Sequence, residues 1–211
     1  MWKDNTMFDI STYLNRRNNL RTGIDSGIIL LMGNDESPMN YADNIYRFRQ
    51  DSSFLYYFAL NRAGLVGIID VDQDKHYLYG NDFTINDAVF MGFQPTLSKL
   101  AEAAGVKETG TLSNLETCLK DAVAKGRNIH FLPPYRAENK IKLWRWLGIN
   151  PMETQNAASV ELIKAVVAQR EIKSDEELEE IEKAVDTSVD MHVAAMQMVR
   201  PGLIESDIVS K

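Results

Sequence analysis

The sequence contains a single cysteine, Cys118, which excludes a disulfide within the chain. Basic residues are outnumbered, with 23 Lys and Arg against 30 Asp and Glu, so the net charge is −7. An acidic chain lacks the positive surface that general binding to nucleic acid or to an anionic membrane requires. No apolar run approaches the roughly eighteen residues of a membrane span, and the stretch MWKDNTMFDIS has no apolar signal core. We therefore expect a cytoplasmic protein that binds neither nucleic acid nor membrane.

Short signatures of several catalytic classes are also missing. The sequence contains no G-x-G-x-x-G fingerprint, Walker loop, G-x-S-x-G elbow or H-E-x-x-H motif. The three histidines are His76, His130 and His192, and none of them has a second His or Cys at the spacing of metal ligands. A D-x-D-x-D string over 70–74 matches the start of a calcium loop. However, Lys75 stands where that loop needs glycine and no Glu stands at its twelfth position, which favours a polar hairpin turn.

Short apolar runs alternate with segments of helical periodicity through the first 150 residues. The predicted strands are 28–32, the aromatic-rich run 54–60, 65–71, 75–79 and 128–132. The predicted helices are 9–21, 96–104, 112–125, 136–147 and 159–169. The run 28–32 is apolar throughout, which is typical of a strand buried on both faces. This order predicts an α/β domain in which a mixed β-sheet is flanked by helices.

The most regular pattern lies near the C-terminal end of the sequence. Ser174 and Glu177 fit a capping box, in which the hydroxyl and the carboxylate each accept a hydrogen bond from the backbone of the other residue. Apolar residues then recur every three or four positions over 178–199, which predicts an amphipathic helix of about seven turns. Pro201 lacks a backbone donor and Gly202 tolerates unusual backbone angles, so the helix ends before them and a second helix opens.

Two strings of residues resemble the Xaa-Pro aminopeptidases (aminopeptidase P). The first is R-x-I-K-S-x-x-E-L, followed after one helix by R-P-G-x-x-E. Its residues here are Arg170, Ile172, Lys173, Ser174, Glu177, Leu178, Arg200, Pro201, Gly202 and Glu205. The second is Y-x-F-R-Q-x-S-x-F-x-Y over 46–56. The sequence departs from the family pattern at Ser53, where Asp is usual, and at 59–60, where a small residue followed by Gly is usual.

The resemblance implies a creatinase/aminopeptidase P N-terminal domain with ribonuclease-H-like layering over 8–170. Residues 171–211 would be the truncated helical start of a pita-bread catalytic domain. The parent would be a metalloprotease that removes the N-terminal residue from peptides with proline second. In the family, two divalent ions, typically manganese, activate the attacking water. Their Asp, His and Glu ligands all follow the R-P-G-x-x-E phrase, so we expect no cofactor, metal ligand or catalytic residue in this chain, which would be inactive alone.

Arg47, Arg49 and Asp51 are the candidate site residues. If the segment is extended, residues two apart point to the same side. Two guanidinium groups beside a carboxylate can bind a peptide carboxylate or a partner subunit. The resemblance implies that this domain borders the active site and supports a homo-oligomer. The alternative is an internal ion-pair network that only braces the loop.

Two further functions stay open for the whole protein. Prolidase and creatinase share the two-domain plan of the aminopeptidase, so the chain could be the N-terminal domain of a related enzyme. It could also be a non-catalytic peptide-binding module. Proline-containing peptides are the expected partners of the aminopeptidase.

Overall fold

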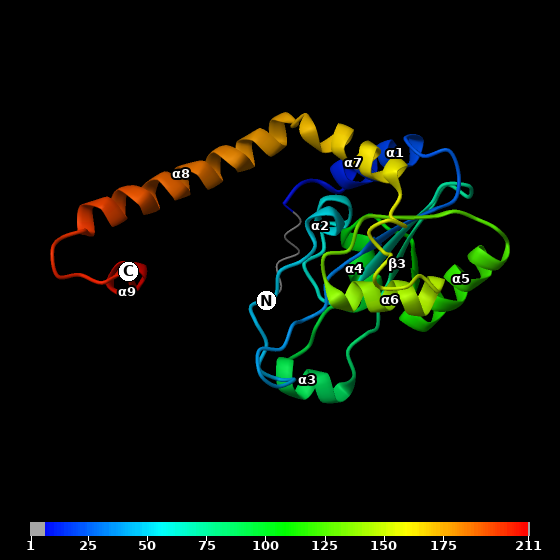
Figure 1. Ribbon diagram of the computed structural model, residues 1–211, viewed down its shortest axis with the longest axis horizontal. Helices are drawn as coiled ribbons and strands as arrows, with labels where there is room; N and C mark the ends of the chain where they lie inside the picture. Colours follow the sequence, from blue (N-terminus) through cyan, green and yellow to red (C-terminus); the bar gives the residue numbers. More distant parts are fainter. Residues whose placement is uncertain (1–6, 211) are drawn as a thin grey trace. The chain divides into compact units, whose positions relative to one another are not determined.

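The computed structural model describes residues 7–210, and the chain divides into two compact units, Met1–Gln169 and Arg170–Lys211. A five-stranded mixed sheet in the order β4-β3-β2-β1-β5 forms the centre of the first unit (Figure 1). The strands are β1 (Ile28–Met32), β2 (Val66–Asp70), β3 (Lys75–Tyr79), β4 (Glu108–Gly110) and β5 (Ile129–Phe131). β1 is parallel to β5 and antiparallel to β2, and β3 is antiparallel to β2 and parallel to β4. Four strands therefore run in one direction, and β2 runs against them.

Helices form a layer on each face of this sheet. The helices between residues 10 and 171 are α1 (Ile10–Thr22), α2 (Ser52–Phe58), α3 (Ile85–Met91), α4 (Leu97–Ala103), α5 (Leu112–Ala124), α6 (Ala137–Leu147) and α7 (Val160–Glu171), of which α3 buries no residue and belongs to neither layer. Side chains of α1, α2, α4 and α7 pack on one face, and side chains of α5 and α6 pack on the other. The predicted fold class, a mixed sheet flanked by helices, is confirmed.

The all-apolar sequence of β1 follows from this layering. Alternate side chains of a strand point to opposite faces. Ile29 and Leu31 belong to the core under α1 and α2, whereas Ile28, Leu30 and Met32 belong to the core under α5 and α6. Every residue of β1 is buried, as the sequence predicts for a strand covered on both faces.

The strand predicted over 54–60 is wrong, because residues 54–58 lie in helix α2. The Asp51 carboxylate starts the helix by accepting hydrogen bonds from the backbone N–H groups of Ser53 and Phe54, both at 2.9 Å. The aromatic side chains then find space on the sheet at Gly67. A Cβ atom there would lie 2.1 Å from the Phe58 ring, so only glycine admits this contact. The helix α3, which begins with a capping box of Thr84 and Asp87, and the short strand β4 are absent from the sequence-based prediction.

Arg17 is a fully buried arginine that ties several elements together. Its guanidinium donates hydrogen bonds to the carbonyl oxygens of Tyr57 at 2.7 Å, Ala104 at 2.8 Å and Gly105 at 3.2 Å. These carbonyls belong to α2 and to the turn after α4. Within residues 7–210, Arg17 has no carboxylate partner. Burial lowers the pKa of Arg17 to about 10, so the group still carries its charge at neutral pH.

The fourth partner of Arg17 is His76 in β3. Arg17 Nε lies 3.3 Å from His76 Nδ1 and donates to it, which requires Nδ1 to be unprotonated. Burial, and then the charge of Arg17, lower the pKa of His76 to about 4. The imidazole is therefore neutral at physiological pH, and the isolated histidine noted in the sequence has a structural partner.

The second unit contains α8 (Asp175–Met198) and α9 (Glu205–Val209). The predicted capping box is confirmed: Glu177 N donates to Ser174 Oγ at 3.4 Å, and Ser174 N donates to Glu177 Oε2 at 2.9 Å. The helix ends before Pro201, as predicted. Its apolar stripe is exposed and includes Leu178, Val185 and Met196. Across residues 7–210, no helix combines the length and the apolar character needed to cross a bilayer.

Replacing Arg17 with Met tests the buried arginine. Met keeps much of the side-chain volume but leaves the carbonyls of Tyr57 and Ala104 without donors. Because each unpaired buried carbonyl costs about 1–3 kcal/mol, we expect the free energy of unfolding to fall by roughly 2–4 kcal/mol, measured by urea denaturation. The control is Arg145→Met, which removes an exposed ion pair with Glu116 and should change stability by less than about 1 kcal/mol. Equal effects of the two substitutions would contradict this assignment.

Candidate functional site at one edge of the sheet

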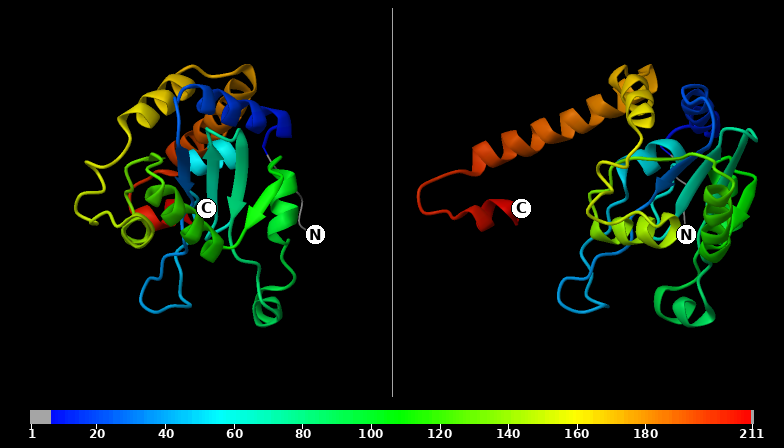
Figure 2. Two further views of the ribbon diagram at one scale, coloured as in Figure 1. Left: turned by 90° about the vertical axis from the view of Figure 1, so that its right-hand side faces the viewer. Right: turned by 45° about the vertical axis from the view of Figure 1, so that its right-hand side comes forward.

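The sheet topology brings distant segments of the chain to one edge. β1, β3, β4 and β5 all end there, and β2 begins there. The segments that follow β1 and β3, residues 33–50 and 80–95, project from this edge and are separate in sequence but neighbours in space (Figure 2). In α/β sheets, ligands bind at the carboxyl ends of the strands, so a ligand site is expected at this edge.

Gln50 holds the segment after β1 in place from inside the domain. Its side chain is buried and makes four hydrogen bonds. Oε1 accepts from the backbone N–H groups of Asn34 at 2.7 Å and Asp51 at 2.9 Å. Nε2 donates to the carbonyls of Leu60 at 3.2 Å and Arg62 at 2.7 Å. One side chain thus joins both ends of the 34–50 segment to the segment that leads into β2.

The three predicted site residues do not form a cluster. Asp51 points into its own helix, where it caps α2. The side chains of Arg47 and Arg49 are exposed, and within residues 7–210 neither makes an ion pair or a hydrogen bond through its guanidinium. Within residues 7–210 the ion-pair brace considered as an alternative is therefore not formed. A border position for Arg47 and Arg49 stays a prediction, since both side chains are open to a partner.

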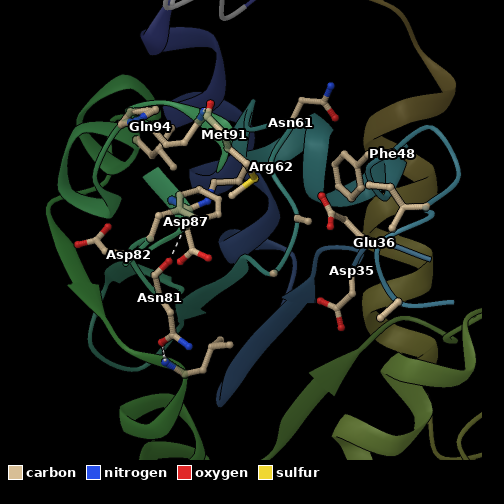
Figure 3. Close-up of a pocket in the computed structure, with 18 of the residues that line it drawn as sticks. Asp35, Glu36, Phe48, Asn61, Arg62, Asn81, Asp82, Asp87, Met91 and Gln94 are labelled. Carbon is tan, nitrogen blue, oxygen red and sulfur yellow. Dashed lines mark hydrogen bonds between the residues drawn. The ribbon is translucent and has the colours of Figure 1, made fainter. Parts of the chain in front are cut away.

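A hollow of about 810 Å³ lies between the two projecting segments (Figure 3). In Figure 3 the side chains of Asp35, Glu36 and Phe48 stand across from those of Met91 and Gln94. The floor and walls also include apolar residues: Pro38, Ile45, Phe83, Pro95, Leu100 and Leu112. A hollow with an apolar interior and a few charged groups is a typical ligand site.

Arg62 is the one basic residue among the described residues that line the hollow. It donates a hydrogen bond to the carbonyl of Asn81, and its guanidinium lies 4.4 Å from the centre of the Phe83 ring. Burial lowers the pKa of Arg62, while the negative charge of Asp82 opposes this shift. Asp82 itself accepts a hydrogen bond from the backbone N–H of Leu97 at 2.5 Å. These contacts join the entrance of β2 to the segment after β3.

An ion pair braces the opposite wall of the hollow. Lys142 of α6 lies 2.8 Å from the Asp35 carboxylate, and Arg136 donates to the Asp35 carbonyl at 3.2 Å. Glu36 makes no hydrogen bond within residues 7–210 and keeps its carboxylate open to the hollow. The apolar lining of the hollow can therefore contact an apolar group of a ligand, and the carboxylate of Glu36 can attract a positively charged one.

Helix α3 adds an exposed apolar surface beside the hollow. It lies at the end of the first unit opposite α1 (Figure 1). Its apolar face, which we define as Ile85, Val89, Phe90, Met91 and Phe93, is open to solvent; Phe90 is 88% exposed and Phe93 95%. Such a concentration of exposed apolar residues is typical of an interaction surface.

The hollow has groups for binding but no set for covalent or metal chemistry. Among its described lining residues there is no Ser, Cys, His, Tyr or Lys. Within residues 7–210, no three His, Cys, Asp or Glu side chains come together to hold a metal ion. The residues present therefore do not fit the pair of divalent ions that the family resemblance implies.

Comparisons with known proteins agree with the observed fold. The family model of the aminopeptidase P N-terminal domain matches residues 13–130. A "Probable Xaa-Pro aminopeptidase" of Aspergillus terreus is 24% identical over 193 residues, which cover 92% of this chain and 38% of that protein. An Xaa-Pro dipeptidase of Homo sapiens is 26% identical over 189 residues, which cover 87% of this chain and 36% of that protein.

A solved structure shares the fold at low sequence identity. It is zinc-substituted aminopeptidase P of Escherichia coli in complex with product, with a TM-score of 0.79 and 20% identity. The match covers 96% of this chain and 48% of that chain. This chain thus spans less than half the length of the proteins it matches.

Fold and site define the class: an α/β domain with a mixed sheet and a ligand-sized hollow at one edge. Because the matched segment is more than half of the chain, the protein belongs to the aminopeptidase P N-terminal domain family. The resemblance read from the two residue strings is confirmed. Sequence reasoning missed the roles of Gln50, Arg62 and Asp82, although Gln50 stands inside the string that carries the resemblance.

Replacing Gln50 with Leu tests the internal support of the edge. Four backbone groups would lose their partners, so we expect the free energy of unfolding to fall by about 2–4 kcal/mol. The amides of Asn34 and Asp51 should exchange with solvent faster than in the unchanged protein, as measured by hydrogen exchange. Gln73→Leu, at an exposed position in the β2–β3 turn, is the matched control and should leave those amides protected. Unchanged protection in Gln50→Leu would contradict the role of Gln50.

Proposed function

We propose that this chain is the N-terminal, non-catalytic portion of a metal-dependent Xaa-Pro aminopeptidase, which removes the N-terminal residue from peptides with proline second. The family match over residues 13–130 carries this proposal. The hollow and the exposed arginines support a role in bordering the active site, because they offer binding groups without catalytic ones. Proline-containing peptides are then the partners of the whole enzyme, and a cytoplasmic location is part of this proposal.

A related dipeptidase is the second candidate. The Xaa-Pro dipeptidase of Homo sapiens is as similar to this chain as the aminopeptidase of Aspergillus terreus, at 26% and 24% identity. Creatinase-type enzymes share the same plan, and a peptide-binding module without catalysis is a further alternative. The names of the two relatives differ in the substrate they imply: a dipeptidase cleaves an Xaa-Pro dipeptide, whereas an aminopeptidase removes the N-terminal residue of a peptide.

We assign the metal ions to the part of the relatives that this chain does not span. The zinc-substituted relative supports a metal-dependent parent, and two divalent ions, with manganese as the native metal, are our proposal. Residues 8–170 would form the N-terminal domain, and residues 171–211 would open the catalytic domain. The exposed stripe of α8 supports this division, because an amphipathic helix needs an apolar surface to cover its stripe.

The first test uses the longer protein encoded by the reading frame that contains this chain. We expect it to release the first residue of a fluorogenic Xaa-Pro-Xaa peptide, to lose turnover on chelation and to regain it with manganese. A matched peptide with Ala at position two is the control and should not be cleaved. The chain described here should show no turnover and no tight manganese binding by calorimetry. Cleavage of Xaa-Pro dipeptides alone would favour the dipeptidase.

The second test concerns Arg49, which we place with Arg47 at the border of the active site or at a subunit contact. In the longer protein, Arg49→Ala should reduce peptide turnover or oligomer assembly several-fold while metal content is unchanged. Because the guanidinium makes no hydrogen bond or ion pair within residues 7–210, the melting temperature of this chain should stay the same. A lower melting temperature together with normal turnover and assembly would show that Arg49 has only a structural role. Exposed Arg145, on α6 and away from the hollow, provides a matched Arg→Ala control.

A further inference from the structure

A second, much smaller cavity lies where β1 and β5 end. Its volume is about 30 Å³. Most of its lining is apolar and comes from β1 and from residues 132–134. Three polar side chains also line it: Asp51 at the start of α2, Tyr135 after β5 and Asn139 in α6. The cavity is therefore a meeting point of three segments that are far apart in sequence.

Asn139 contributes to this cavity a buried side-chain amide. Its side chain is only 5% exposed, although α6 begins just two residues earlier at the surface. Nδ2 lies 3.5 Å from the carbonyl oxygen of Gly33 and donates to it. Oδ1 is buried and makes no hydrogen bond within residues 7–210. Exchanging the amide N and O would place two acceptors against each other at Gly33, so Oδ1 is the atom that lacks a donor.

Folded proteins rarely leave such an atom unpaired. More than about 90% of buried polar groups have a partner, and those that lack one in the chain are commonly paired with an internal water. An unpaired buried carbonyl is unfavourable because it has lost its hydrogen bonds to solvent. A donor that reaches Asn139 Oδ1 is therefore required, and the described chain does not provide it.

The other two polar groups of the cavity have hydrogen-bonding capacity to spare. Asp51 uses Oδ1 for both of its bonds to the start of α2, which leaves Oδ2 as an acceptor. The Tyr135 hydroxyl accepts a hydrogen bond from Asn34 Nδ2 at 2.9 Å and so keeps its own hydrogen to donate. The lining thus offers two acceptors and one donor, which is the complement of a single water molecule.

We propose that this cavity is the site of one internal water molecule, which donates to Asn139 Oδ1 and Asp51 Oδ2 and accepts from the Tyr135 hydroxyl. Its volume exceeds the roughly 10–15 Å³ that one water requires. A bound sodium or potassium ion fits less well, since such ions need more oxygen ligands than three side chains supply. The water links the cap of α2 to α6 and to the segment after β5. It therefore helps to fix Asp51, and with it the end of the segment that carries Arg49.

The test counts long-lived internal waters in this chain by magnetic relaxation dispersion of water oxygen. Asn139→Leu keeps the side-chain shape and removes the acceptor, so the count should fall by one. Asn18→Leu, the same change at an exposed position of α1, should leave it unchanged. Because Asn139→Leu could impair folding, Tyr135→Phe is the second variant; it removes the donor from a largely exposed side chain and should shorten the residence time of that water.

A crystal structure of the unchanged chain gives the direct observation. We expect one density peak within hydrogen-bond distance of Asn139 Oδ1, Asp51 Oδ2 and the Tyr135 hydroxyl. An unchanged water count in folded Asn139→Leu, a dry cavity or a peak with the coordination of a metal ion would each overturn the proposal. None of these measurements depends on peptidase activity, so their outcome is separate from that of the proposed function.

Discussion

The buried charge of Arg17 is the interaction on which the rest of the first unit depends. A guanidinium without a carboxylate partner can be buried only where enough carbonyl oxygens replace its water. Three carbonyls do so here, and they come from α2 and from the turn after α4. Burial, together with this charge, lowers the pKa of His76 and keeps the imidazole neutral, and the hydrogen bond from Arg17 makes Nδ1 its acceptor nitrogen. The layer on one face of the sheet is therefore organised by a polar contact as well as by apolar packing.

The segment after β1, at the edge of the sheet that carries the hollow, is held by a second buried polar side chain. Gln50 satisfies four backbone groups, so the 34–50 segment is fixed from its interior. Its outward side chains are then not needed for stability, and Arg47 and Arg49 stay open to solvent. A domain that borders a site formed with another domain or subunit needs a fixed backbone that carries charged side chains without partners inside the domain. The segment with Arg47 and Arg49 meets this requirement within residues 7–210.

The two exposed apolar surfaces have different settings. The α3 face lies beside the hollow of the first unit, whereas the α8 stripe belongs to the second unit. Both surfaces group several exposed apolar residues together, whereas such residues are normally scattered singly over a protein surface. Grouped apolar surfaces are typical of contacts with further protein. The chain spans less than half of its relatives, which is consistent with surfaces that those longer proteins would cover.

The sequence by itself determined the elements whose signals are local. Neighbouring residues determine the apolar run of β1, the turn of the β2–β3 hairpin and the capping box of α8. The family resemblance is likewise readable from two short strings of residues. Tertiary structure alone decided the rest. Residues 54–58 are helical because Asp51 caps α2 and Gly67 makes room for Phe58. Partners distant in the chain determine the roles of Arg17 and Gln50 and form the hollow between 33–50 and 80–95. The order of residue types does not show which carbonyl groups will surround a buried polar side chain, because the fold brings those groups together.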